Sequence, residues 1–227
     1  MSRQFILSSF ARTVVASAAI GLLVACSATM PTEKADKDFV EVERGNFDHV
    51  LMRPNEPLAK LSRVSIAEPV VAMSDYWLRD HRNDYSERDL QRIKEDYARA
   101  LKQALTDVLT NKSLVEVVEA PEQAEVVIRP SLRDLNIYAP DFLTLPARTD
   151  QYVEVAGNAT LNLEFVDPRS NRVLAQFVDH RETPAIVIGS LEETNRVTNF
   201  RLFRRLMERW SNNLAQYLYE QGLVVKR

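Results

Sequence analysis

The sequence VEVAGNATLNLEF, residues 153–165, decides the fold of this chain. Apolar or small residues occupy every second position from Val153 to Phe165, and the positions between them are mostly polar. A period of two is typical of a β-strand that turns one face toward a core and the other toward water. The sequence therefore predicts a long, half-buried strand.

This strand should form an antiparallel hairpin with the residues that follow it. Residues 167–171, Asp-Pro-Arg-Ser-Asn, are dense in turn formers, and Val173 to Arg181 again has extended character. We expect a register that keeps the apolar pairs on one side of the sheet. The expected pairs are Phe165 with Val173, Leu163 with Ala175 and Leu161 with Phe177.

A first amphipathic helix is predicted from Ser86 to about Thr110. Ser86 is a suitable N-cap with Asp89 three residues on, and Asn111 is a suitable left-handed stop. Apolar residues recur at steps of three and four, which places them on one face. That stripe consists of Leu90, Ile93, Tyr97, Leu101, Ala104, Leu105 and Val108.

A second helix is predicted from about Thr198 to Gln221, with Gly222 as its stop. Its buried stripe consists of Phe203, Leu206, Met207, Trp210, Leu214, Tyr217 and Leu218, and its outer side carries Arg201, Arg204, Arg205 and Arg209. A charged outer side is typical of a solvated helix. The alternative is a site for an anionic partner such as peptidoglycan or lipid headgroups.

Shorter strands complete the pattern. Residues 64–70 alternate as a half-buried strand that Pro69 confines to a sheet edge or a strand end. Further strands are predicted at 114–118 and at 124–129, and the second of these should be central in the sheet. The aromatic segment from Met73 to Tyr85 is interpreted as a loop that caps the core.

The order strand, helix, two strands, hairpin, helix predicts an α+β fold. We expect a two-layer sandwich with a four- to five-stranded, mostly antiparallel or mixed sheet and both long helices on one face. The predicted organisation is a signal peptide at residues 1–25, a tether at 26–57 and a single domain at 58–227. The tether should make one short apolar contact around Phe47 to Met52.

The only cysteine, Cys26, ends a short apolar run. Arg3 and Arg12 precede residues 13–25, which end in small side chains as secretory signals do, and the run is too short to span a hydrocarbon core about 30 Å thick. Residues 23–26, Leu-Val-Ala-Cys, resemble the lipobox of bacterial lipoproteins. This resemblance implies cleavage before Cys26, a diacylglyceryl group on its thiol and an acyl chain such as palmitate on its new amine. The alternative is a buried N-terminal helix of a cytosolic protein.

Removal of residues 1–25 would leave a formal net charge of −5, because that segment holds two arginines and no acids. An exported, mildly acidic protein is unsuited to nucleic-acid binding. Ser27 after the lipidated residue resembles the outer-membrane sorting signal of Gram-negative lipoproteins. In such a bacterium we expect the domain to face the periplasm, anchored to the outer membrane.

Several segments together carry a resemblance to a known family. They are the lipobox, the strand at 64–69, Tyr97-Ala98-Arg99-Ala100-Leu101, the hairpin from 163–167 to 172–175 and the closing helix with Trp210. Together they resemble the domain-of-unknown-function 3313 family of bacterial lipoproteins over nearly the whole mature chain. This chain has Pro168 to Asn171 where that family favours a Thr-Gly turn. The family implies an envelope lipoprotein and supplies no catalytic residues.

Few residues are spaced for chemistry. The five glycines lie too far apart for a dinucleotide- or phosphate-binding loop of the known motifs. His49, His81 and His180 are not spaced as a ligand pair. The sharpest enzyme or zinc hypothesis is a cluster of Asp80, His81, Asp179 and His180, which requires two distant segments to meet. We otherwise expect no catalytic residue, no metal and no cofactor.

The expected function is that of a non-enzymatic envelope module that docks a protein or assembles with copies of itself. The alternatives are an envelope hydrolase with paired carboxylates and a peptidoglycan-binding accessory protein. Residues 139–148 form an apolar loop braced by two prolines, and Phe142, Leu143 and Leu145 in it are the candidate partner-binding residues. A loop that merely covers a sheet edge is the other interpretation.

Overall fold

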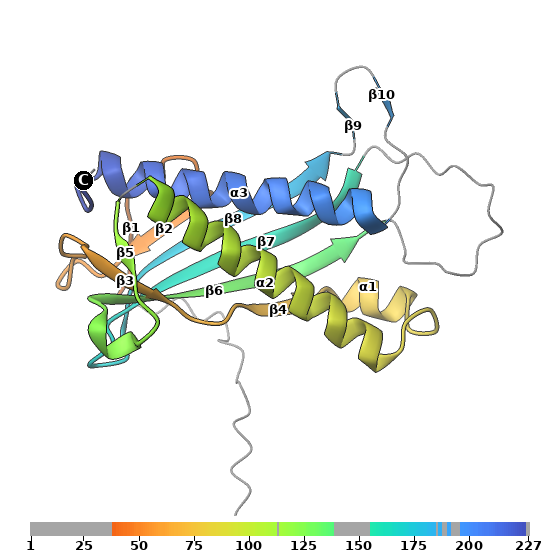
Figure 1. Ribbon diagram of the computed structural model, residues 1–227, viewed down its shortest axis with the longest axis horizontal. Coiled ribbons are helices and arrows are strands. Elements are labelled where there is room, and N and C mark those ends of the chain that lie inside the picture. The colour runs from red at the N-terminus through yellow and green to blue at the C-terminus, as the bar shows by residue number, and fades with distance from the viewer. Residues whose placement is uncertain are drawn as a thin grey trace, which may run out of the picture. The chain divides into compact units, whose positions relative to one another are not determined.

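The computed structural model describes residues 38–112, 114–138, 155–184, 186–187, 190–191 and 196–225 (Figure 1). These residues belong to a compact unit that spans Asp36–Arg227. Its helices are α1 (Asp75–Asp80), α2 (Glu87–Asn111) and α3 (Arg196–Glu220), and a 3-10 turn covers Pro121–Gln123. Its strands are β1 (Val40–Glu41), β2 (His49–Met52), β3 (Arg63–Ile66), β4 (Val70–Met73), β5 (Glu116–Val117), β6 (Val126–Ile137), β7 (Val155–Val166), β8 (Val173–Pro184), β9 (Ile186–Val187) and β10 (Ser190–Leu191).

Eight of these strands form one mixed sheet in the order β1-β2-β8-β7-β6-β3-β5, with β4 also paired to β6. The long strands β6, β7 and β8 are antiparallel, whereas β3 and β4 lie parallel to β6. Helices α2 and α3 cover the same face of the sheet (Figure 1). The predicted two-layer α+β sandwich is therefore confirmed, and β6 is central as predicted. The sheet exceeds the predicted four or five strands because residues 64–70 form two strands and β1 and β2 extend one edge.

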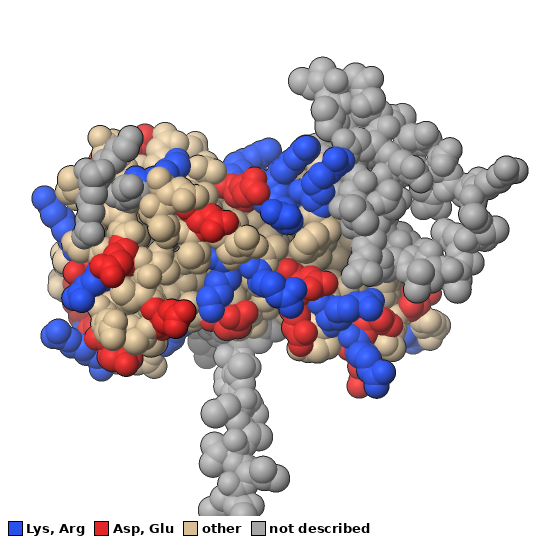
Figure 2. Space-filling view, in the orientation of Figure 1, with Lys and Arg blue, Asp and Glu red and all other residues tan. Residues whose placement is uncertain are grey.

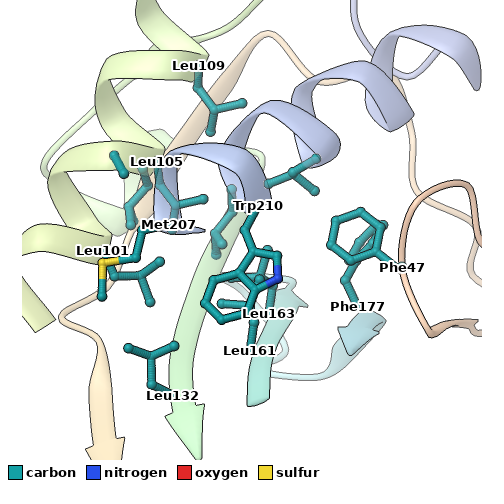
Figure 3. Packing of buried hydrophobic residues seen from close by; sticks show 14 of the residues in the cluster. Phe47, Leu101, Leu105, Leu109, Leu132, Leu161, Leu163, Phe177, Met207 and Trp210 are labelled. Carbon is teal, nitrogen blue, oxygen red and sulfur yellow. The ribbon is translucent and has the colours of Figure 1, made fainter. Parts of the chain in front are cut away.

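The core lies between the two long helices and the sheet. The predicted stripe of α3 is buried throughout, and that of α2 is buried except for the partly buried Leu90 and Val108. Figure 3 shows Trp210 and Met207 of α3 beside Leu101 and Leu105 of α2, above Leu161 and Leu163 of the sheet. Full burial of a large apolar side chain contributes about 1.5–3 kcal/mol. This layer therefore supplies much of the stability of the domain.

The helix ends follow the sequence signals in part. Ser86 and Asp89 form a capping box, because the Asp89 N–H donates to Ser86 Oγ at 3.2 Å and the Ser86 N–H donates to Asp89 Oδ2 at 3.3 Å. Gly222 ends α3 with a φ of 66°. The predicted left-handed stop at Asn111 is wrong, since Asn111 is the last residue of α2 and the following Lys112 stays right-handed.

In the part of the chain that the structure describes, no helix is both long and apolar enough to cross a membrane.

Strand β6 passes through Pro130 at the centre of the sheet, where proline is rare because it cannot donate a hydrogen bond. The Ile128 carbonyl accepts from the Ala67 N–H at 2.9 Å, so the main-chain groups of Pro130, two residues on, face the same side. At this level β3 has ended at Ile66 and β4 begins only at Val70. The missing N–H of Pro130 therefore faces the break between the two strands.

The hairpin of β7 and β8 forms as predicted, but the predicted register is wrong by two residues. Phe165 pairs with Ala175 and Leu163 with Phe177. Two features of the turn set the observed register. The Asp167 N–H donates to the Arg172 carbonyl at 2.9 Å, and a bulge interrupts the ladder beside Phe165. A shift of two residues keeps the side chains from Ala175 onward on their predicted face, whereas a shift of one would have reversed them. Val173 is the exception, because the bulge places it opposite Val166 instead of Phe165.

The outward side chains of β7 are more enclosed than a water-facing surface predicts. Asn162 and Glu164 are only 5% and 8% exposed. The Gln176 amide donates to Glu164 Oε1 at 3.2 Å, and Thr160 Oγ1 lies 3.0 Å from His180 Nδ1. Polar side chains on neighbouring strands therefore cover one another on this face.

The predicted boundary between a tether at 26–57 and a domain at 58–227 is wrong for the described residues. Strand β2 pairs with β8 along its length, and β1 pairs with β2. Phe47 and Val50 are buried in the core, so the predicted apolar contact in this region is confirmed. Residues from at least Val40 onward are therefore part of the folded domain.

The aromatic segment from Met73 to Tyr85 contains the helix α1 rather than only a loop. Ser74 caps this helix by accepting a hydrogen bond from the Trp77 N–H at 3.1 Å. Trp77 is buried, and its indole N–H donates to the Ile137 carbonyl at 2.8 Å. The segment caps the end of β6, as predicted, with a helix.

Candidate functional site

Four arginines of α3, Arg201, Arg204, Arg205 and Arg209, form a row that we call the basic strip. Steps of three and four residues place them on one side of the helix. All four are exposed, whereas Phe203, Leu206, Met207 and Trp210 on the other side are buried. Figure 2 shows Lys and Arg side chains gathered over the N-terminal half of α3. The solvated outer side predicted from the sequence is confirmed.

The charge of α3 differs from that of its neighbour and of the chain. Helix α3 holds five arginines and two glutamates, a net charge of +3, whereas α2 holds five residues of each sign. Two of the three arginines of α2 pair along the helix, Arg92 with Asp89 at 3.1 Å and Arg99 with Asp96 at 3.0 Å. Within the described residues, no ion pair involves Arg204, Arg205 or Arg209. This positive surface lies on a chain whose net charge is −3.

The basic strip works against the stability of its own helix. Arg201 and Arg205, and again Arg205 and Arg209, are separated by four residues, and like charges at this spacing cost about 0.2–0.5 kcal/mol per pair. Helix α3 also has no acidic residue in its first turn, where a carboxylate would be favourable. Glu208 lies four residues after Arg204 and three after Arg205, so it offsets part of this cost. Pairing along the helix therefore contributes little net stability, and the strip, with more arginines than acids, is suited to bind an anion.

A second polar constellation joins the segment before β2, strand β8 and helix α3. The Asp179 carboxylate is inaccessible to solvent, yet both of its oxygens have donors. Trp210 Nε1 donates to Oδ2 at 2.7 Å, and Oδ1 lies 2.7 Å from Arg181 Nη2 and 3.1 Å from the Asp48 nitrogen. Arg181 also donates to Asp48 Oδ1 at 3.1 Å, and the His180 N–H donates to Asp48 Oδ2 at 2.8 Å.

The two carboxyl groups of this network are shifted in opposite directions. Burial raises the pKa of Asp179 above its ordinary value, against the opposing effects of the Trp210 hydrogen bond and the Arg181 charge. Burial alone would also raise the pKa of Asp48, but the His180 N–H and the Arg181 guanidinium outweigh it and lower the pKa. Because its oxygens are occupied and enclosed, Asp179 has a structural role and offers no free oxygen for proton transfer.

The hypothetical cluster of Asp80, His81, Asp179 and His180 does not form. Asp80 pairs with Arg79 at 3.1 Å, and the His81 ring stacks on Trp77 at a centroid distance of 4.5 Å. Asp179 points into the core, and His180 points to the opposite face, since neighbours in a strand alternate. Among the described residues, no three His, Cys, Asp or Glu side chains are grouped to hold a metal ion.

The other residues predicted for function lie outside the described residues. These are Cys26 and the partner-binding candidates Phe142, Leu143 and Leu145. The structure does show what the apolar segment connects. Ile137 of β6 pairs with Gly157 of β7, so residues 138–154 join two adjacent antiparallel strands. Two to five residues are enough for such a connection, and its greater length favours a role beyond joining the strands.

Strand β7 begins beneath the basic half of α3. Ala156 and Leu202 are buried against each other. Gly157 has a φ of 152°, and a Cβ there would lie 2.1 Å from the Asn136 carbonyl oxygen and 2.8 Å from the Phe203 ring. The start of β7 therefore fits against α3 only with glycine at this position.

The sequence contained a signal for the Asp179 network, but the incorrect register predicted for the hairpin of β7 and β8 obscured it. Along β8 the inward positions read Ala175, Phe177 and Asp179, so a carboxylate follows two apolar residues on the core face. A charged residue in a buried register requires a partner. No sequence pattern identifies Asp48 as part of this network, because it lies 131 positions from Asp179.

No protein-family model and no curated protein matches the chain. Among solved structures, the PelC dodecamer from Paraburkholderia phytofirmans is 12% identical, with a TM-score of 0.36 over 67% of this chain and 89% of that chain. A putative neuraminyllactose-binding hemagglutinin homolog from Helicobacter pylori is 17% identical, with a TM-score of 0.40 over 74% and 90%. The DUF330 protein XCC0632 from Xanthomonas campestris is 11% identical, with a TM-score of 0.39 over 74% and 90%. Likenesses at this level identify neither a family nor an activity.

Proposed function

We propose that the protein is a lipid-anchored docking module of the bacterial cell envelope, without an enzymatic activity of its own. One observation carries the proposal: Leu23-Val24-Ala25-Cys26, with the chain's only cysteine, follows an apolar run that begins after Arg12. Acylation of Cys26 with more than one chain would anchor the protein stably, because each buried methylene contributes about 0.8 kcal/mol. The resemblance to the 3313 family of lipoproteins agrees with this function.

A docking role is supported by the apolar connection between β6 and β7. It is longer than the two to five residues that suffice to join such strands, and Phe142, Leu143 and Leu145 give it apolar side chains suited to contact a partner. We place that partner on the periplasmic side of the outer membrane.

The hydrolase alternative is less favoured by the same geometry. Asp48 and Asp179 are carboxylates brought close together, but Arg181 binds both and Asp179 is enclosed. A hydrolytic pair needs one carboxylate free to act on water or on the bond to be cleaved.

The test is to express the full chain in a Gram-negative host and to follow radiolabelled palmitate. The wild type should incorporate label and fractionate with the outer membrane, and Cys26→Ser should remain an unlabelled precursor. Ser27→Asp is the matched control, which should keep the label and move the protein to the inner membrane. Equal labelling of wild type and Cys26→Ser would overturn the proposed function.

A further inference from the structure

Resting on the proposed lipid anchor, we infer that the basic strip of α3 binds the anionic phospholipid surface of the membrane that holds the protein. Arg201, Arg204, Arg205 and Arg209 would lie against phosphate headgroups, so the domain would dock in one orientation. The lipid on Cys26 supplies attachment, and the strip supplies the direction in which the body faces.

The chemistry of the strip fits phosphate. A guanidinium group offers a planar fork of donors that binds phosphate in a bidentate manner and stays charged at every physiological pH. The strip runs from Arg201 to Arg209, about 12 Å along the helix at 1.5 Å per residue. Its arginines are long, exposed side chains, so they can meet a fluid array of headgroups without a fixed pocket.

The length of chain outside the described structure places the membrane within reach. Residues 26–37 lie between the anchored residue and Asp38, where the described chain begins. Twelve residues extend to about 40 Å at most. Asp38 is itself held to the domain by an ion pair with Arg53 at 3.0 Å. The nearest dense array of anions for this domain is therefore the headgroup layer of its own membrane.

The energetics favour an interaction that needs the anchor. Each arginine close to an anionic bilayer contributes roughly fivefold to the partition constant, the equivalent of about 1 kcal/mol. Four arginines give a constant on the order of 10³ M⁻¹, which is weak for a free protein. Attachment through Cys26 raises the effective concentration of the surface to the millimolar range. The strip would then be bound for much of the time.

The experiment measures partitioning of the chain from residue 26 onward with Cys26→Ser, which contains the whole compact unit but no lipid. Vesicles contain either phosphatidylcholine alone or phosphatidylcholine with phosphatidylglycerol, at low and high salt. The test variant is Arg204→Gln/Arg205→Gln/Arg209→Gln. The control is Arg88→Gln/Arg92→Gln/Arg99→Gln on α2, which removes the same charge elsewhere.

The parent and the α2 control should bind phosphatidylglycerol vesicles at low salt and dissociate from them at high salt. The partition constant of the α3 variant at low salt should be roughly 100-fold lower. Equal losses in both variants, or equal binding to neutral vesicles, would overturn the inference. Retention on purified peptidoglycan sacculi, lost with the three α3 substitutions while the vesicles stay unbound, would also overturn it. The unlipidated chain makes this result independent of whether cells acylate Cys26, so the two proposals fail separately.

Discussion

The indole nitrogen of Trp210 donates a 2.7 Å hydrogen bond to the carboxylate of Asp179, and neither side chain is accessible to solvent. Trp210 lies on the closing helix and Asp179 on the central hairpin, so this bond joins the two layers of the sandwich. Figure 3 shows Trp210 among the apolar side chains beneath α3, and the bond adds a polar link to this layer.

Two substitutions of Trp210 should separate packing from hydrogen bonding. Trp210→Ala empties a large buried volume and should cost about 3–5 kcal/mol in the free energy of unfolding. Trp210→Phe keeps most of the ring but removes the donor, and should cost about 1–3 kcal/mol by leaving Asp179 Oδ2 unpaired. Urea denaturation of both variants measures these values. An unchanged midpoint for Trp210→Ala would place this residue outside the core.

Asp179→Asn should destabilise the protein at neutral pH. The amide cannot accept from all three donors that surround the carboxylate, and Arg181 loses one of its two carboxylate partners. We expect a loss of about 1–3 kcal/mol at pH 7. The matched control Asp89→Asn alters only the exposed capping box of α2 and the ion pair of Asp89 with Arg92, so it should leave the Asp179 network unchanged.

The loss caused by Asp179→Asn should also depend on pH. The pKa of Asp179 is raised in the folded protein above the ordinary value of 3.8, so the folded state binds this proton more tightly than the unfolded state. The resulting stabilisation is full below pH 3.8 and is lost as the pH rises through the folded-state pKa. The free energy of unfolding of the wild type should therefore rise relative to that of Asp179→Asn as the pH falls from 7 toward about 4. A difference that stays constant over this window would contradict the raised pKa.

Gly157→Ala should destabilise the domain far more than Gly222→Ala. Both glycines have positive φ, but a Cβ at Gly157 would collide with the Asn136 carbonyl, whereas nothing lies within 4 Å at Gly222. Gly222→Ala should cost only the backbone strain, roughly 1–2 kcal/mol. Gly157→Ala adds overpacking against backbone and the Phe203 ring, commonly about 1–3 kcal/mol more. Thermal unfolding compares the two, and similar melting temperatures would be inconsistent with the close approach of β7 to α3.

Phe142→Ser combined with Leu145→Ser separates the two interpretations of the loop between β6 and β7. A partner-binding loop should lose copurification of its envelope partner while the melting temperature stays nearly level. A covering loop should instead lower the melting temperature by several degrees, roughly 2–4 °C per kcal/mol for a chain of this size. Substitution of the exposed Tyr76 by Ser is a suitable control for loss of apolar surface elsewhere.

The elements that follow from the sequence are those with strong local periodicity. Helix α2 carries its start in Ser86 and Asp89 and its buried face in a regular stripe, so few distant contacts are needed to specify it. The faces of β7 and β8 follow from alternation alone. Alternation does not fix their register. It decides only which face of the sheet a side chain occupies, and the turn at 167–172 sets which residues pair.

The elements that the sequence conceals depend on distant partners. Strands β1 and β2 have two and four residues, too few for a period to show. Pro130 marks a break in the neighbouring strand rather than the end of its own, which only the pairing of β3 and β4 reveals. The basic strip was visible as a charged helix side, but the lack of described ion pairs at Arg204, Arg205 and Arg209 required the structure.

The pairing of β2 with β8 also has a consequence for folding kinetics. Asp48 and Asp179 meet across 131 positions, and the Phe47 ring packs against Tyr217 of the last helix at a centroid distance of 6.5 Å. Such nonlocal contacts slow folding, because a large loop must close before they form. During synthesis β1 and β2 emerge early, but they can join the sheet only once β8 follows. A chain that has emerged only as far as α2 therefore cannot reach its native core.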